Sequence, residues 1–347
     1  MKNSIVSILF LLLIVSCSKQ EAQQELKPVN FLDAEVQEVK KREFAGSELK
    51  LEFEKDLEEL GIYSLPSFVE TEDNFVLVDN SELVIKHLNK TDLTTISSFK
   101  IQKGRGPKEL EFIMSFDASE DLIAVADNRL MKIILVDHEG NLVNEFTTER
   151  KPSRLNIAPN GNLNLLFFLT FVNMESTLIY NLTQDGDVNY IFENEDYTDM
   201  HAFDISGSIK TIGDTLYYVG AYAPFIKKYV NGDLISSRAT IDNYDSSINY
   251  ITVISGETRS TSLSPHAMFS SNDFDVKGER IFIVPNSNGD PEFSFIDIYN
   301  SSDGSYIKSY RTIDVAGNIN VYEDERSILT IEKVGELGRL VFRKYSY

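Results

Sequence analysis

Residues 101–145, IQKGRGPKELEFIMSFDASEDLIAVADNRLMKIILVDHEGNLVNE, contain one complete structural repeat of this chain. A glycine-rich connector leads into an apolar run, DLIAVADN at 121–128, and then into a second apolar run that ends in Val-Asp. Short runs rich in Val and Ile, bounded by Gly, Asn and Asp, are typical of β-strands. Glu139-Gly140 follows as a tight turn, because glycine adopts positive φ at little steric cost. The stretch therefore predicts strands joined by hairpins.

Similar apolar runs recur along the chain. They begin at residues 74, 121, 161, 214, 280 and 327, so successive starts lie 47, 40, 53, 66 and 47 residues apart. Spacing of this size is typical of β-propeller blades, which have four strands each. The runs come as hairpins rather than as strands separated by crossover helices. The sequence therefore predicts an all-β, six-bladed β-propeller of four-stranded antiparallel blades over residues 47–347.

Both ends of this predicted propeller have strand patterns. Residues 47–56 alternate Leu49, Leu51 and Phe53 with charged neighbours, and RLVFRKYSY at 339–347 ends the chain. Alternation with a period of two is expected of a strand with one buried face. We expect the N-terminal strand to join the C-terminal blade and so to close the ring.

The first seventeen residues, MKNSIVSILFLLLIVSC, have the features of an export signal. A positive charge at Lys2 precedes an apolar run at 5–15 that is too short to span a bilayer. Cys17 follows Ile-Val-Ser, which resembles the bacterial lipobox, although an ordinary signal peptide with an incidental cysteine is the alternative. The sequence predicts a lipoprotein signal peptide at 1–16, a lipid-anchored tether at 17–46 that begins with acylated Cys17, and a location in the cell envelope.

Charge and cysteine content exclude several kinds of partner and chemistry. The chain has 54 Asp and Glu residues against 33 Lys and Arg residues, for a formal charge of −21. A negative field of this size repels phosphate backbones, so we expect no nucleic-acid partner. Cys17 is the only cysteine, and its acylation would leave no thiol for a disulfide or a nucleophile. We expect a monomeric body whose stability comes from packing.

Three stretches resemble one known family, the six-bladed β-propeller lipoproteins of Bacteroidetes, which are distant relatives of the NHL-repeat propellers. LKLEFEKDLEELGIYSLPSFVETEDNFVLVDN at 49–80 is similar to the family's entry strand and first blade, and GRGPKEL at 104–110 to its connector. PFIKKYVNGDLISSRATIDNY at 224–244 is similar to its fourth blade. The resemblance implies a propeller in the cell envelope and no catalytic residues. We expect this propeller to be held at the outer membrane, facing either the periplasm or the medium.

Two classes of function are consistent with these features. The favoured one is a binding or assembly module of the cell envelope that has a protein or glycan partner and is not an enzyme. The alternative is a propeller hydrolase, lactonase-like or lyase-like, with a metal in the central channel. An enzyme of that kind would bring carboxylates, Asn or His from several blades to one end of the channel.

Four residues are candidate ligand-binding residues. Lys103 and Arg105 lie in the GRGP connector, where a glycine-rich backbone with cations can hold an anion, although a structural turn between blades is favoured. Tyr222 ends the apolar run 214–222 and is a candidate for stacking against a sugar, although most aromatic side chains pack in cores. His201 is one of four histidines, which are far apart in the sequence and include no metal-binding pair.

One acidic stretch, ENEDYTDMHAFD at 193–204, contains oxygen ligands of the type that calcium prefers. Glu195, Asp196 and Asp199 are the candidate calcium ligands. The stretch lacks the spacing of a self-contained calcium loop, so a solvated loop is the favoured interpretation. We expect no cofactor, and calcium is the alternative.

Overall fold

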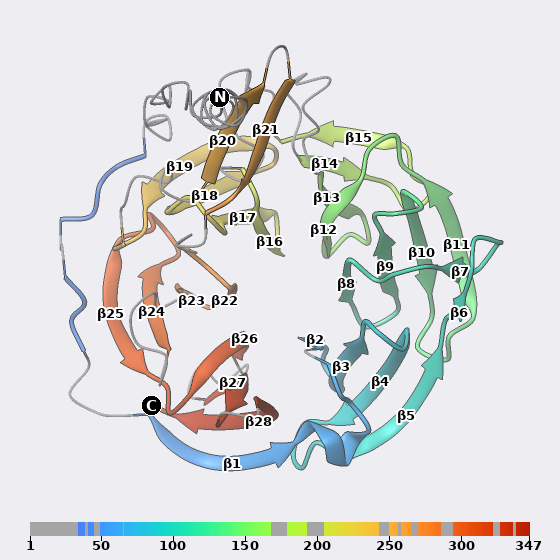
Figure 1. The fold of residues 1–347 in the computed structure, drawn as a ribbon, viewed down its shortest axis with the longest axis horizontal. Helices are drawn as coiled ribbons and strands as arrows, with labels where there is room; N and C mark the ends of the chain where they lie inside the picture. The colour runs from blue at the N-terminus through green and yellow to red at the C-terminus, as the bar shows by residue number, and fades with distance from the viewer. Residues whose placement is uncertain are drawn as a thin grey trace, which may run out of the picture. The chain divides into compact units, whose positions relative to one another are not determined.

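The computed structural model describes residues 34–38, 41–44, 49–64, 66–167, 179–192, 205–242, 250–255, 258–264, 270–285, 294–321, 327–335 and 338–347. In the unit formed by Val29–Ser246 and Met268–Tyr347, six four-stranded antiparallel sheets lie in a ring (Figure 1). The fold is the predicted six-bladed β-propeller. Among the described residues, no helix is long and apolar enough to cross a membrane.

The first three blades follow one another along the chain. Blade 1 contains β2 (Ser67–Glu70), β3 (Asn74–Asp79), β4 (Val84–Asn89) and β5 (Thr95–Lys100). Blade 2 contains β8 (Ser115–Ala118), β9 (Ile123–Asp127), β10 (Lys132–Val136) and β11 (Leu142–Thr147). Blade 3 contains β12 (Pro152–Ile157), β13 (Leu163–Phe167), β14 (Ile179–Leu182) and β15 (Val188–Ile191).

The next two blades have the same order, and the sixth uses both ends of the body. Blade 4 contains β16 (Gly207–Ile212), β17 (Thr215–Gly220), β18 (Phe225–Val230) and β19 (Asp233–Ala239). Blade 5 contains β22 (Asp273–Lys277), β23 (Arg280–Val284), β24 (Phe295–Asn300) and β25 (Tyr306–Arg311). Blade 6 contains β26 (Val315–Val321), β27 (Ser327–Val334), β28 (Arg339–Ser346) and, outermost, β1 (Lys50–Asp56).

Among the described residues, one short helix and two two-stranded sheets lie outside the blades. A 3-10 helix, η1 (Leu57–Leu60), follows β1, and β6 (Gln102–Lys103) pairs in parallel with β7 (Glu109–Leu110) in the glycine-rich connector. The other two-stranded sheet is the antiparallel hairpin of β20 (Tyr250–Ser255) and β21 (Thr258–Leu263), which belongs to the separate unit formed by Met1–Pro28 and Ser247–Ala267.

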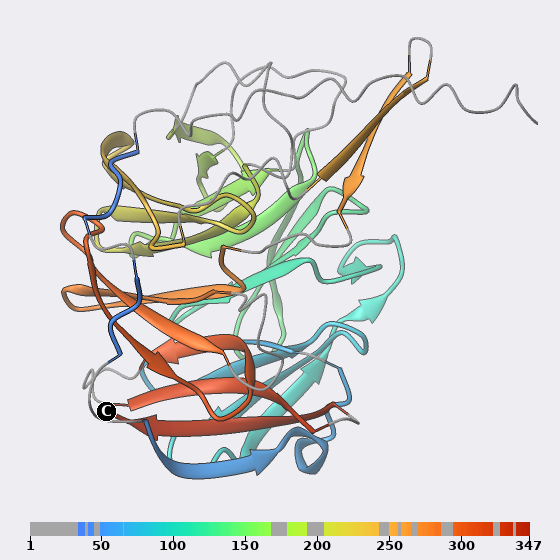
Figure 2. The same ribbon diagram turned by 60° about the vertical axis from the view of Figure 1, so that its left-hand side comes forward.

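The ring closes through β1, as the sequence predicts. β1 pairs antiparallel with β28, from Lys50 opposite Ser346 to Asp56 opposite Val341. The two strands lie side by side in both ribbon views (Figures 1 and 2). The last blade therefore has three strands from the C-terminus and one from the N-terminus.

The apolar runs that recur in the sequence are the second strands of the blades, and both of their faces are buried. In β9, Ile123 and Val125 pack toward blade 1, whereas Ala124 and Ala126 pack toward blade 3. Alternate side chains of a strand point to opposite faces. A strand between two neighbouring blades therefore needs apolar residues at every position, which gives a continuous run.

The hairpin glycines of the outer strands have a second role in packing. Gly140 lies between β10 and β11 with φ +85°, and a Cβ atom there would lie 2.7 Å from the Phe99 ring of blade 1. Gly186 has the same relationship to Phe146 one blade further on. Each glycine therefore allows both the positive φ of the turn and the close approach of an aromatic ring from the preceding blade.

Part of the segment assigned to the tether makes specific contacts with blades 4 and 5. We call residues 34–44 the strap; its described residues run beside β19 and β25 (Figure 1). The buried Gln37 side chain donates to the carbonyl oxygens of Ala239 and Gly304 at 2.8 Å and accepts from the Tyr306 N–H at 2.9 Å. The strap thus connects two blades before the chain reaches β1.

Arg42 provides the charged contact of the strap. Its Nε and Nη2 donate to the Asp297 carboxylate, each at 2.9 Å, Nη2 also pairs with Asp242, and the guanidinium lies 4.7 Å from the Phe295 ring centre. Burial opposes the charge, but hydrogen bonds and the charges of Asp297 and Asp242 outweigh it and raise the pKa of Arg42. Asp297 is therefore a buried carboxylate with a charged partner.

Candidate functional site: the central channel

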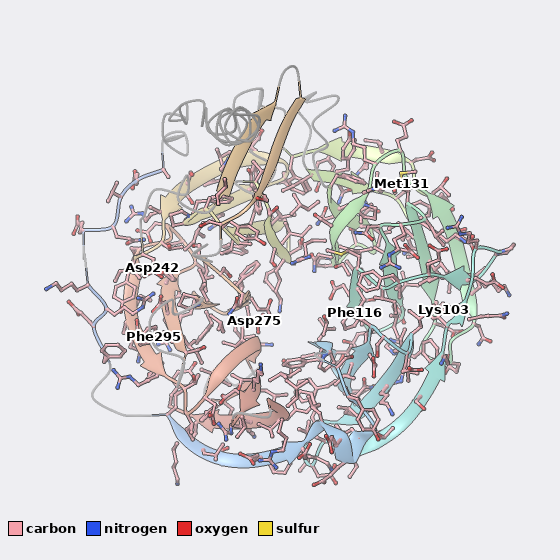
Figure 3. The ribbon with its side chains drawn as sticks, in the orientation of Figure 1. Lys103, Phe116, Met131, Asp242, Asp275 and Phe295 are labelled. Atoms are coloured by element: carbon pink, nitrogen blue, oxygen red, sulfur yellow. The ribbon has the colours of Figure 1, made fainter. Side chains whose placement is uncertain are left out.

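The innermost strands of all six blades enclose a cavity of about 220 Å³ on the propeller axis. Its lining includes one or more residues of each blade, among them Phe68, Asp117, Arg154, Lys210, Asp273 and Ile319. Figure 3 shows Phe116 of β8 and Asp275 of β22 on opposite sides of this axis. The cavity is the place where side chains from distant parts of the sequence converge.

Alternation along the inner strands brings polar side chains to this cavity. On β12, Arg154 and Asn156 flank Leu155, and on β22, Asp273 and Asp275 flank Phe274. Leu155 and Phe274 are buried in the cores between blades. Because residues two apart share a face, each of these strands presents two polar groups on one side.

Lys210 provides a positive charge near three carboxylates, of which Asp117 and Asp273 line the cavity and Asp275 does not. Its ammonium forms an ion pair with Asp275 of the neighbouring blade, whose side chain is buried. Burial acts to lower the pKa of Lys210, but the charge and hydrogen bond of Asp275, together with the charges of Asp117 and Asp273, raise it. Lys210 therefore remains charged and links blade 4 to blade 5.

Asp117 and Asp273 are carboxyl groups in a poorly solvated environment. Asp117 accepts hydrogen bonds from Asn156 Nδ2 at 2.6 Å and the Ile157 N–H at 2.7 Å, yet burial raises its pKa to about 6. Asp273 accepts from the Ile319 N–H at 3.1 Å, and burial, with a contribution from the Asp275 charge, raises its pKa to about 6. The charge of the channel therefore changes near pH 6.

Arg154 and Asn156 have unused hydrogen-bonding capacity. Arg154 donates from Nε to Ser208 Oγ at 3.3 Å and from Nη1 to the Ser153 carbonyl at 2.8 Å, and it forms no ion pair with any described residue. Burial lowers the pKa of Arg154, although the charges of Asp273 and Tyr222 act to raise it. Asn156 is 6% exposed, and its Oδ1 has no hydrogen-bond partner in the described part of the chain.

The described donor set differs from that of a metal site. Within the ranges that the structure describes, no three His, Cys, Asp or Glu side chains are grouped so as to hold a metal ion. Near Asp117, Asp273 and Asp275 the counter-charge is the Lys210 ammonium. This arrangement suits hydrogen bonding and charge pairing with a polar organic molecule.

Tyr222, one of the residues that the sequence singles out, interacts electrostatically with a residue of this cavity. Burial raises the pKa of the half-buried Tyr222, and the charge of the channel residue Arg154 acts to lower it. Lys103 and Arg105 are exposed on the connector; Figure 3 places Lys103 at the periphery, and Arg105 pairs with Glu111 at 2.5 Å. Cys17, Glu195, Asp196, Asp199 and His201 lie outside the described residues.

The structure also brings together two histidines that the sequence leaves 51 positions apart. His87 Nε2 lies 2.9 Å from His138 Nδ1, Ser97 Oγ lies 3.0 Å from His87 Nδ1, and His138 Nε2 lies 2.9 Å from the Ser119 carbonyl oxygen. Since a carbonyl only accepts, His138 Nε2 must donate, and a neutral pair then has His87 Nε2 donating to His138 Nδ1. Their separation in sequence, close to one blade repeat, is the signal that could have indicated this contact.

Comparison with known proteins identifies the fold but no family. No protein-family model and no curated protein matches the chain. A solved structure described as an exported protein of Bacteroides fragilis is 10% identical, with a TM-score of 0.57, over 90% of this chain and 98% of that one. A member of the DUF4221 family from Bacteroides vulgatus is 12% identical, with a TM-score of 0.54, over 86% and 98%.

A luciferin-regenerating enzyme also has a similar fold, with 10% identity and a TM-score of 0.53 over 85% of this chain and 96% of its own. At these identities the likeness concerns the fold alone. Propeller folds serve many unrelated functions, so the function must be argued from the channel itself.

Proposed function

We propose that the protein is an exported binding module that holds a small polar ligand in the central channel. The observation that carries this proposal is the convergence of Arg154, Asn156 and Lys210 on one cavity, with unused hydrogen-bonding capacity at Arg154 and Asn156. Buried polar groups are ordinarily hydrogen-bonded, and exceptions need a reason. A ligand that satisfies these groups is such a reason.

A crystallographic screen with small polar molecules tests this function. The expected result is ligand density in the channel, in contact with Arg154 or Asn156. Replacement of Ser208, which lines the cavity and is partly exposed, by Trp should remove that density while distant sites remain occupied. If hits gather elsewhere on the surface and water alone fills the channel, the proposed function is wrong.

The proposal includes a lipid anchor at Cys17 that holds a monomeric propeller at the outer membrane. The leader sequence supports export, and the likeness to an exported Bacteroides propeller agrees with it. Cys17→Ala should move the protein from the membrane fraction to the soluble fraction and abolish labelling by a radioactive fatty acid. Protease treatment of intact cells then distinguishes a surface-facing from a periplasmic body. A variant that stays membrane-bound and labelled contradicts the anchor.

The alternative, a propeller hydrolase or lyase with a channel metal, has less support. The described carboxylates Asp117, Asp273 and Asp275 lie near an ammonium group rather than in a cluster with further metal ligands. Binding of a protein or glycan partner elsewhere on the molecule is a separate proposal.

A further inference from the structure

We infer that the channel ligand is a small carboxylate that also carries a hydroxyl or amide N–H group. In the bound complex, the carboxylate lies against the Arg154 guanidinium and the donor group is hydrogen-bonded to Asn156 Oδ1. This inference rests on the proposed function and specifies its ligand class.

Arg154 provides the anion-binding part. An arginine side chain has five N–H donors in a planar fork that matches a carboxylate. The structure uses two of them, on Ser208 and on the Ser153 carbonyl, so both N–H groups of Nη2 and one of Nη1 remain. This end of the guanidinium can bind both oxygens of a carboxylate. No described carboxylate forms an ion pair with it.

Lys210 would not compete for the same anion on equal terms. Its ammonium already pairs with Asp275, so its charge is partly neutralised. Arg154 has electrostatic contact with Asp273 but no ion pair with it, and Ser208 is a neutral partner. Among the described cations of the channel, Arg154 is therefore the one whose charge is not already paired with a carboxylate.

Asn156 specifies the second group of the ligand. Its amide nitrogen donates to Asp117 at 2.6 Å, which fixes the orientation of the amide and leaves Oδ1 as an acceptor. Oδ1 is buried and has no hydrogen-bond partner among the described residues, and an unsatisfied buried acceptor costs about 1–3 kcal/mol. A hydroxyl or N–H donor of the ligand would remove that cost, whereas a second carboxylate would not.

The spacing suits a single small molecule. Arg154 and Asn156 are two residues apart on β12, so their Cα atoms lie about 6–7 Å apart on the same face of the strand. The cavity of about 220 Å³ is smaller than the pockets of roughly 300–1,000 Å³ that hold drug-sized ligands. The ligand is therefore of the size of a hydroxy acid or a single acidic sugar.

Calorimetry with matched probes tests the inference. 3-Hydroxybutyrate is compared with butyrate, which lacks the donor, and with 3-hydroxybutyramide, which lacks the charge; glucuronate and glucose provide a second charged and neutral pair. We expect at least one of the two acids to bind, and each incomplete analogue of that acid in the panel to bind about tenfold more weakly or worse. Arg154→Gln should weaken the acid about tenfold or more, and Asn156→Leu should abolish the preference over butyrate.

Arg105→Gln is the matched control, because it removes the same charge from an exposed connector residue and should leave every affinity unchanged. If the neutral analogues bind the channel as tightly as the acids, or if Arg154→Gln binds the acids normally, the ligand class is wrong although a channel site remains. If no acid of the panel binds while crystals show other molecules in the channel, the inference is again wrong. If no molecule of the crystallographic screen gives density in the channel, the proposed function itself is wrong.

Discussion

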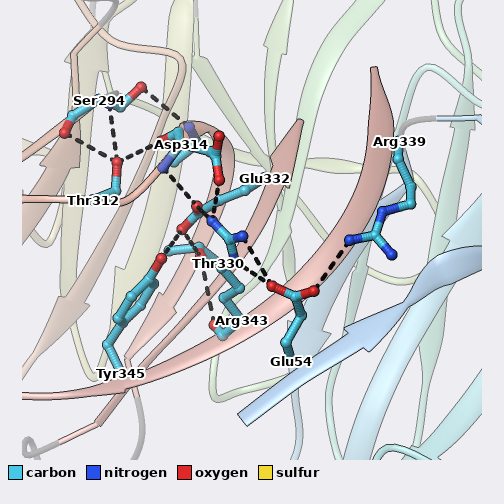
Figure 4. Close-up of polar contacts among 10 residues, drawn as sticks. Glu54, Ser294, Thr312, Asp314, Thr330, Glu332, Arg339, Arg343 and Tyr345 are labelled. Carbon is cyan, nitrogen blue, oxygen red and sulfur yellow. Dashed lines mark hydrogen bonds and ion pairs between the residues drawn. The ribbon is translucent and has the colours of Figure 1, made fainter. Parts of the chain in front are cut away.

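Arg343 on β28 and Glu54 on β1 form an ion pair across the seam of the ring, with Nη2 and Oε2 2.9 Å apart. The same guanidinium pairs with Glu332 of β27 at 2.8 Å and with Asp314 at 2.5 Å (Figure 4). Arg343 and Glu332 are buried, whereas Glu54 is one-third exposed. The network connects the N-terminal strand to the C-terminal blade. Its ion pairs therefore stabilise the closure of the ring, which is noncovalent.

Removing the two partners of this ion pair should have unequal effects. Arg343→Ala leaves Glu332 buried without its cation, which should lower the free energy of unfolding by about 3–5 kcal/mol. Glu54→Ala removes a partly exposed partner and should cost about 1 kcal/mol or less. Urea unfolding of both variants measures the difference, with the more exposed Arg339→Ala as a control for loss of positive charge. Equal losses in the two seam variants would contradict the buried role of Arg343.

Gly140 should be more sensitive to substitution than a glycine in open space. Gly140→Ala adds a methyl group 2.7 Å from Phe99 at a positive φ, whereas Gly335→Ala meets a similar φ constraint with no atom of the described residues within 4 Å. We expect Gly335→Ala to cost about 1 kcal/mol and Gly140→Ala roughly 1–3 kcal/mol more. Thermal unfolding of both variants tests this. In a Phe99→Ala background the difference between the two glycines should shrink, and an unchanged difference would show that the ring is not responsible.

Asp117 should make the protein less stable as the pH rises. Its pKa is about 6 in the folded state and 3.8 for an ordinary Asp, so between these values the folded protein binds more protons than the unfolded chain. The contribution of protonated Asp117 to the free energy of unfolding is therefore fully present below pH 4 and is lost as the pH rises through 6. A difference of about two units between the folded and unfolded pKa corresponds to a change of about 3 kcal/mol at most in the free energy of unfolding.

Asp117→Asn isolates that contribution. Relative to this variant, the wild-type free energy of unfolding should fall by up to about 3 kcal/mol between pH 4 and pH 7, as measured in urea at a series of pH values. The amide keeps an oxygen that can accept from Ile157 N–H, as Asp117 does. Parallel pH profiles for the two proteins would show that Asp117 has an ordinary pKa in the fold.

The same titrations should make acid binding in the channel pH-dependent. The charged groups that face the cavity or pair with its lining are Arg154 and Lys210 on one side and Asp117, Asp273 and Asp275 on the other. Ionisation of Asp117 and Asp273 near pH 6 adds negative charge close to a bound carboxylate. We expect the affinity for a hydroxy acid to fall about tenfold between pH 5 and pH 8, and to fall less in Asp117→Asn. Calorimetry across this range would contradict the charge arrangement if the affinity were constant.

The blade pattern was predictable because each second strand is buried on both faces. Runs such as 121–128 are continuously apolar for that reason, and the positive φ of Gly140 is typical of a hairpin. The joining of β1 to β28 was also predictable, since a ring of sheets has a stable closure when the two ends share a blade. These features follow from local patterns that repeat at a regular interval.

The channel and the strap were not predictable in the same way. Arg154-Leu155-Asn156 has the alternation of any half-buried strand, and only the register of the blade shows that its polar side faces the axis. Gln37 and Arg42 find partners more than 200 residues away, in Ala239 and Asp297, and His87 meets His138 only because neighbouring blades place them together. The strap contacts depend on tertiary arrangement alone, and the histidine pair has only its separation of about one blade repeat as a signal in the sequence.

The strap has a mechanical consequence. Any pull applied at the N-terminal end reaches Glu35, Gln37 and Arg42 before it reaches β1, because these residues are fastened to blades 4 and 5. Tension would therefore load the Arg42–Asp297 pair and the Gln37 hydrogen bonds first. The hydrogen bonds between β1 and β28 would carry the tension only after the strap had detached from blades 4 and 5. The strap therefore protects the closure of the ring from tension at the N-terminal end.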